Sequence, residues 1–354
     1  MFGLVRTLWA AMVVIGHIFW VSDFGRFAVF GFYILSGYLM TYVMHNTYGF
    51  TTNSKLKFAS NRFLRLYPAF WVTSILTVIL LLIMGPSNNG KFEIIQLPNS
   101  LESTFSNATM LYLHWMPSLV TPRLSPATWA LTVEIFFYTM IAIGASKTLL
   151  RTYFWVGLSL AYVLLSYIFG LYWHARYFSI PAGSLPFSLG ALIYFLVRDK
   201  KSNFVPEAWI RNPFLLFLGM FCTAVFASFA ITRGLSLWAM EILFYFSTLL
   251  SFLIVLSLAK GYILCKPLTK AWDKKIGDYS YPFYLLHYLA AAIASFWLLG
   301  RIDVFKADVT ITSILVFFTI LMFISTFIIK SIDHPIEKVR LRIKNRKNID
   351  IKAI

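Results

Sequence analysis

The chain has 354 residues, of which 59% are hydrophobic and only 13% are charged. A soluble domain carries about 25% charged residues, so this composition excludes an ordinary soluble protein, and equally a disordered chain. The two cysteines, Cys222 and Cys265, exclude a disulfide scaffold, and no metal site is expected. The net charge of +17 would suggest nucleic acid in a soluble protein. Basic residues also gather in the cytoplasmic loops of membrane proteins, so we expect a lipid bilayer and no nucleic-acid partner.

Ten apolar segments approach or reach the length of about 17 to 25 residues that crosses the hydrocarbon core of a bilayer. They are Leu4–Val21, Phe27–Met44, Ala69–Met84, Trp129–Ala145, Tyr153–Gly170, Ile180–Val197, Pro213–Ala230, Trp238–Leu258, Tyr281–Leu299 and Val309–Ile329. Pro68 and Pro126 are expected at helix starts, where proline loses no hydrogen bond, with Ser125 as an N-cap. The sequence predicts an all-α polytopic membrane bundle of about ten helices in residues 1–335, followed by a basic cytoplasmic tail, 336–354.

The basic residues of the loops predict the orientation of this bundle. Of the 31 Lys and Arg residues, 23 fall in one alternating set of loops and the C-terminal tail, and 7 fall in the other set. This split predicts that both termini lie in the cytoplasm. The longest connection, residues 85–126, then lies outside, and its length indicates that it is structured or functional.

Titratable residues inside the apolar segments are candidate functional groups, because burying them in a bilayer is costly. Arg6 and His17 are 11 residues apart, close to three helical turns, so both project from one face of the first helix. Glu134 lies in the outer third of the fourth segment, at a depth similar to that of His17, where a carboxylate would raise the basicity of an imidazole. Taken alone, His17 would be interpreted as a hydrogen-bonded packing residue, and Glu134 could equally be a structural partner of an arginine.

Other polar residues admit simpler interpretations. Glu241 is interpreted as an interfacial acid facing Arg233. Arg62 and Arg65 are three residues apart, on one face if helical, and paired guanidiniums suit phosphate binding. On their own they would be read as an ordinary positively charged membrane anchor.

Five segments together resemble the acyltransferase-3 family, membrane enzymes that O-acylate bacterial carbohydrates. The similar segments are Arg6–His17 (Arg-x10-His), Phe32–Leu39 (Phe-Phe-x-Leu-Ser-Gly-Phe/Tyr), Arg62–Pro68 (Arg-x-x-Arg-x-x-Pro), Trp129–Glu134 (Trp-Ser-Leu-x-x-Glu) and Ser280–His287 (Ser-Tyr-x-x-Tyr-Leu-x-His). The chain departs from the family at Ala130, where the family has serine. It also has apolar residues, Val29 and Phe30, where many members carry an aspartate.

The resemblance implies an integral-membrane O-acyltransferase of the bacterial cytoplasmic membrane. It would move an acyl group, most often acetyl, from acyl-CoA to a hydroxyl of a cell-surface or exported glycan or lipid-linked saccharide, without a permanently bound cofactor. The implied catalytic residues are His17 as general base, Glu134 as its partner, and Arg6, which would neutralise donor charge or stabilise the oxyanion. Arg62 and Arg65 would bind the CoA phosphates. Further residues that would line the site are Ser36, Trp129, Tyr284 and His287.

Two other functions stay open at this point. A multi-pass transporter would fit the spans and their few buried polar residues, although no internal repeat is visible. An acyltransferase of a small-molecule acceptor would use the same core from the cytoplasmic side. Direct transfer and transfer through an acyl-histidine both remain open.

Overall fold

A computed structural model describes residues 1–19, 21–84, 95–200, 205–234, 236–266, 268–300 and 310–345. Over these residues the chain is helical and contains no strand. Nine of the described helical segments are long and apolar enough to cross a membrane, and α1 (Gly3–Ile18) is apolar but shorter. The predicted all-α polytopic membrane bundle is confirmed.

The chain divides into two compact units. The first contains Met1–Tyr42, Val133–Ile141 and Ala145–Tyr281, and the second contains Val43–Thr132, Ala142–Gly144 and Pro282–Ile354.

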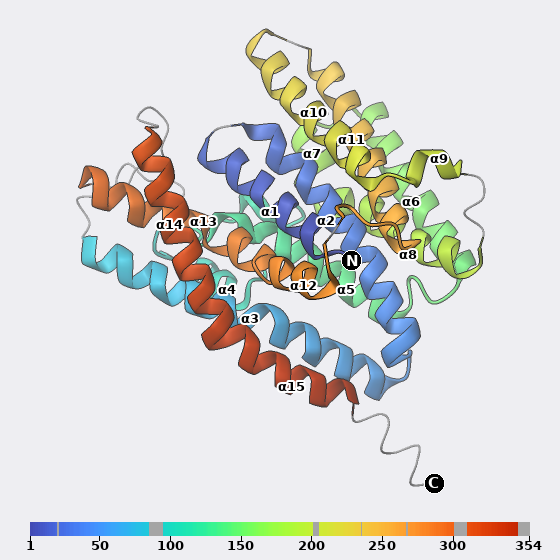
Figure 1. The fold of residues 1–354 in the computed structure, drawn as a ribbon, viewed down its shortest axis with the longest axis horizontal. Helices are drawn as coiled ribbons and strands as arrows, with labels where there is room; N and C mark the ends of the chain where they lie inside the picture. The colour runs from blue at the N-terminus through green and yellow to red at the C-terminus, as the bar shows by residue number, and fades with distance from the viewer. Residues whose placement is uncertain are drawn as a thin grey trace. The chain divides into compact units, whose positions relative to one another are not determined.

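The first unit is built around helices that pack with very close backbones. Its helices are α1, α2 (Ser22–Val43) up to Tyr42, most of α5 (Trp129–Ile143), α6 (Leu149–Ile168), α7 (Trp173–Tyr177), α8 (Ile180–Arg198), α9 (Glu207–Ile210), α10 (Pro213–Thr232), α11 (Leu237–Ala259) and α12 (Lys270–Asp278). Helices α10 and α11 run side by side (Figure 1). Between α2 and α8, a Cβ added at Gly37 would lie 2.2 Å from the carbonyl oxygen of Phe187. Only glycine permits this approach, which is typical of helix pairs in membranes.

Hydrogen bonds to α12, far along the sequence, fix the start of α1 in this unit. The backbone N–H groups of Gly3 and Leu4 each donate to the Asp273 carboxylate of α12, at 2.9 Å. The Thr7 hydroxyl donates to the carbonyl of Ile276 at 2.7 Å. Helix α1 has no side-chain N-cap of its own, so Asp273 satisfies donors that would otherwise be left open at its first turn.

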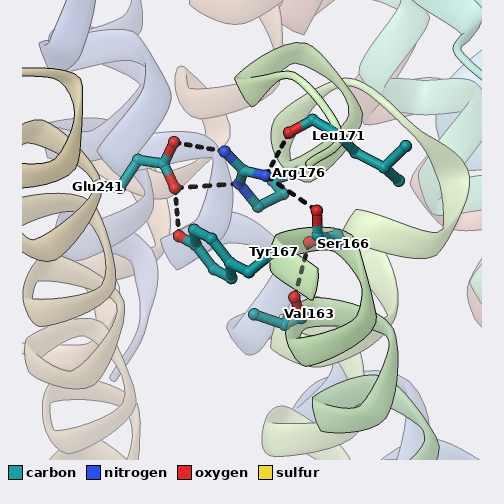
Figure 2. Close-up of polar contacts among 6 residues, drawn as sticks. All are labelled: Val163, Ser166, Tyr167, Leu171, Arg176 and Glu241. Atoms are coloured by element: carbon teal, nitrogen blue, oxygen red, sulfur yellow. Dashed lines mark hydrogen bonds and ion pairs between the residues drawn. The ribbon is translucent and has the colours of Figure 1, made fainter. Parts of the chain in front are cut away.

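Figure 2 shows a buried ion pair that corrects one sequence interpretation. The recorded ion-pair partner of Glu241 is Arg176 of α7 rather than Arg233; Glu241 is 6% exposed and binds Arg176 through both carboxylate oxygens, at 2.6 and 3.0 Å. The Tyr167 hydroxyl of α6 also donates to this carboxylate. Hydropathy placed Glu241 near the interface, but the fold of α7 brings a guanidinium to it.

The second unit contains the longest helix of the described chain. Its elements are η1 (Met44–Tyr48), α3 (Thr52–Met84), α4 (Leu101–Thr109), η3 (Pro117–Leu119), η4 (Pro126–Thr128), most of α13 (Ser280–Leu299), α14 (Ile311–Ile328), η6 (Ile329–Asp333) and α15 (His334–Asn345). Helices α3 and α15 pack side by side (Figure 1). Pro68 lies inside α3, so the expected helix start at this proline is wrong. One interior proline removes a single backbone hydrogen bond, and the polar part of α3 before Pro68 is held by contacts with η1, η6 and α15.

The described part of the predicted external connection, residues 95–126, is ordered by its own polar groups; residues 85–94 lie outside the described residues. Asn107 is 3% exposed, donates to the carbonyls of Ser103 and Pro122, and accepts from the backbone N–H of Leu124. Ser125 does not cap the next helix, because its hydroxyl donates instead to the carbonyl of Leu285, at 3.2 Å.

Candidate functional site

Helices α2 and α5 bring a serine, a glutamate and a tyrosine together in the first unit. The Ser36 hydroxyl donates to Glu134 Oε1 and the Tyr138 hydroxyl donates to Oε2, both at 2.9 Å. Glu134 and Tyr138 are one helical turn apart on α5, so they share a face. Glu134 is 9% exposed, and its carboxylate is thus held by a hydroxyl on each oxygen.

His17 lies in the last turn of α1, where this helix comes close to α2. A Cβ added at Gly25 would lie 3.9 Å from His17 Nε2, and one added at Gly16 would lie 2.8 Å from the backbone nitrogen of Gly25. The two glycines let the helices approach, so the imidazole rests against the α2 backbone. Arg26, the next residue of α2, is near enough for its charge to act on His17.

Arg6 lies in the first turns of α1, at the surface shared with α12. A Cβ added at Gly277 would lie 2.8 Å from the Arg6 guanidinium nitrogen Nη2. The same turns of α1 are held by Asp273 and by the carbonyl of Ile276, so the position of Arg6 depends on α12.

The second unit holds Arg62 and Arg65, both on α3. Arg62 Nη2 donates to the Oδ1 atom of Asn61 at 2.8 Å, and an Arg65 guanidinium nitrogen is 4.0 Å from a carboxylate oxygen of Asp333 in η6. The same Asn61 oxygen accepts two bonds from the Arg340 guanidinium of α15, each at 3.2 Å. Arg62 and Arg340 therefore share one acceptor.

A partly open hollow of about 150 Å³ lies beside these groups in the second unit. Its polar lining comes from η1, α3 and α15, and the α3 and α15 residues are Asn61, Arg62, Glu337, Arg340 and Lys344. The sequence pattern predicts a role for Arg62 but not for Asn61 or for the α15 residues, most of which fall in the predicted basic tail, 336–354. The signal that was available is the spacing of Glu337, Arg340 and Lys344 on one helical face.

Three other predicted residues, Trp129, Tyr284 and His287, are buried in the second unit. The Tyr284 hydroxyl donates to the carbonyl of Ala127 at 2.5 Å, which ties α13 to the turn before α5. His287 is 0% exposed; its Nδ1 is 3.2 Å from the carbonyl oxygen of Phe283 and its ring packs on Tyr288. Their described contacts are thus with the protein's own backbone and rings.

The sequence profile of the acyltransferase-3 family, described as an acyltransferase domain, matches residues 2–330. The chain belongs to the acyltransferase-3 family. As a member of the acyltransferase-3 family it is a multi-pass membrane acyltransferase, which implies a lipid bilayer, an acyl donor and an acceptor. No curated protein and no solved structure matches the chain. Within the described residues, no group of three or more His, Cys, Asp or Glu side chains could hold a metal ion.

Proposed function

We propose that this acyltransferase transfers an acyl group, most often acetyl, from acyl-CoA to a hydroxyl of a cell-surface or exported glycan, in the bacterial cytoplasmic membrane. The observation that carries this proposal is the placement of His17 and the hydroxyl-bound Glu134 within one compact unit. An imidazole and a buried carboxylate are the side chains that general-base transfer to a hydroxyl requires.

In the proposed reaction the acyl group passes directly from the donor to the acceptor hydroxyl in one step. His17 takes the proton of the acceptor hydroxyl while the hydroxyl oxygen attacks the thioester carbon of the donor. The carbon–sulfur bond breaks, and the CoA thiolate leaves with the proton that His17 returns. The charge that builds up on the thioester oxygen needs a cation or hydrogen-bond donor, for which Arg6 is our candidate.

Glu134 is proposed to stabilise the imidazolium that forms on His17 during transfer. Its support is chemical: a negative charge at low dielectric favours the protonated imidazole. The bonds from Ser36 and Tyr138 hold the carboxylate in one orientation, so these two are positioning residues in the proposal.

The donor is proposed to bind through its phosphates to Arg62 and Arg65. Guanidiniums form paired hydrogen bonds with phosphate oxygens, and both arginines follow the basic start of α3. By the charge rule this end of α3 lies in the cytoplasm, where acyl-CoA is available.

The test of this function is the acylation state of surface polysaccharide, read by mass spectrometry in cells that express the protein or lack it. We expect one acyl group per modified residue with the wild type, none with His17→Ala, and wild-type acylation with His174→Ala, a matched change of an exposed histidine. Immunoblots of the membrane fraction check that both variants insert. Acylation retained by His17→Ala would overturn the catalytic assignment, and an acyl group found instead on a cytoplasmic small molecule would overturn the glycan acceptor.

A further inference from the structure

The hollow between α3 and α15 combines residues of the family-matched region with residues outside it. Asn61 and Arg62 belong to the part of the chain that the family profile covers, whereas α15 begins at His334, beyond the end of the match at residue 330. Family membership therefore assigns nothing to Arg340 or Lys344.

Asn61 fixes the spacing of the two arginines that meet here. It is 3% exposed, and its Oδ1 atom accepts from Arg62 Nη2 at 2.8 Å and from Arg340 Nε and Nη2 at 3.2 Å. Its amide nitrogen donates to the carbonyl of Arg340 at 3.3 Å. One buried amide thus holds a side chain of α3 and the backbone and side chain of α15 in register, which preorganises both guanidiniums.

The charges around the hollow favour an anion. Its lining includes three cations, Arg62, Arg340 and Lys344, against a single carboxylate, that of Glu337. The positive charges of Arg62 and Arg65 also act on Arg340, and Glu337 opposes them. Like charges gathered at a partly buried site repel one another, and a bound anion with several acceptor oxygens relieves this repulsion.

The size of the hollow limits what it can take. At about 150 Å³ it is well below the roughly 300–1,000 Å³ of sites that enclose a drug-sized ligand. It therefore suits one or two phosphate groups at the end of a larger ligand rather than a whole nucleotide.

We propose that Arg340 and Lys344 of α15 complete the donor site, and that together with Arg62 they bind phosphate groups of the acyl-CoA donor. This inference rests on the proposed function. It makes α15 part of substrate binding rather than a solvated tail, and it makes Asn61 the positioning residue of the site.

The test is titration of the purified full-length protein with coenzyme A by calorimetry, in a detergent without phosphate headgroups. Arg340→Gln should weaken binding about tenfold or more, as the loss of a charged pair to phosphate predicts. Lys344→Gln, whose exposed side chain is not needed for folding, should weaken it several-fold. Arg342→Gln is the matched control: it removes the same charge from α15 without touching the hollow, and should change the affinity less than about twofold.

The outcomes separate this inference from the proposed function. Wild-type affinity in both Arg340→Gln and Lys344→Gln would overturn the role of α15 and leave the donor proposal standing. Failure of the wild type to bind coenzyme A would overturn the donor proposal itself. A third experiment adds phosphatidylglycerol to the micelles and measures the binding of each ligand. Suppose that the lipid blocks coenzyme A binding in the wild type and in Arg342→Gln. If Arg340→Gln then loses lipid binding but keeps coenzyme A binding, the hollow binds a lipid headgroup and the inference fails.

Discussion

Glu134 and Glu241, two of the buried acids of the first unit, differ in the recorded partners of their carboxylates. Glu241 forms a bidentate ion pair with Arg176, which neutralises it within the fold. Glu134 instead accepts from two neutral hydroxyls, those of Ser36 and Tyr138. These two hydroxyls carry no charge of their own and hold the carboxylate in one orientation.

This difference leads to a prediction for Glu134→Gln. The amide keeps the shape of the carboxylate but not its charge, so the variant should fold and bind donor while losing transition-state stabilisation. We expect kcat to fall at least about 100-fold, within the range of general acid–base contributions, with the KM for acyl-CoA changed less than about threefold. Steady-state kinetics in proteoliposomes measures both constants.

Glu102→Gln is the control for this variant, because Glu102 is an exposed acid of α4. It should leave kcat unchanged. A normal kcat in Glu134→Gln, or a fall explained wholly by KM, would contradict the role proposed for the carboxylate.

At the scale of single elements, α1 depends on a residue about 270 positions away. Its first turn contains no acidic residue and no side-chain N-cap. Asp273 of α12 supplies both the negative charge and the hydrogen-bond acceptors for the backbone N–H groups. The interaction combines two charge-assisted hydrogen bonds with a favourable position at the positive end of the α1 dipole.

Asp273→Ala should therefore destabilise the protein by about 1 to 2 kcal/mol, the upper part of the range for a lost N-cap. It should also lower activity, because Arg6 lies in the turn that Asp273 holds. Thermal unfolding in detergent, followed by intrinsic fluorescence, measures the first effect. Asp199→Ala removes an acid from an exposed ion pair with Arg198 and should shift the unfolding midpoint much less. Equal shifts in the two variants would show that Asp273 is not a cap.

The helices themselves could be predicted from the sequence, but their long-range contacts could not. Apolar length alone located segments such as α10 and α14 to within a few residues. The extent of α3 was missed, since its first half is polar and Pro68 resembles a helix start; packing against α15 decides it. Ser36 of α2 as a partner of Glu134, and Arg340 of α15 as a second donor to the Asn61 oxygen that Arg62 bonds, both depend on which helices become neighbours, and hydropathy carries no information on that.

At the scale of the whole molecule, the uneven charge distribution predicts a topology that can be tested with the chain's own cysteines. Cys265 is exposed and lies in the basic connection between α11 and α12, on the predicted cytoplasmic side. Leu119 is 57% exposed and lies in the predicted external connection. The two positions should therefore differ in access to a reagent that cannot cross the membrane.

The reagent is a membrane-impermeant maleimide applied to spheroplasts. It should label the introduced cysteine of Leu119→Cys when Cys222 and Cys265 are both changed to serine. It should not label Cys265 when Cys222 alone is changed to serine. After permeabilisation both should be labelled, which controls for intrinsic reactivity. The reverse labelling pattern would show that the bundle has the opposite orientation, with the basic start of α3 outside, away from cytoplasmic acyl-CoA. Because the donor proposal needs Arg62 and Arg65 on the cytoplasmic side, that one result would overturn the assigned topology and the proposed direction of transfer together.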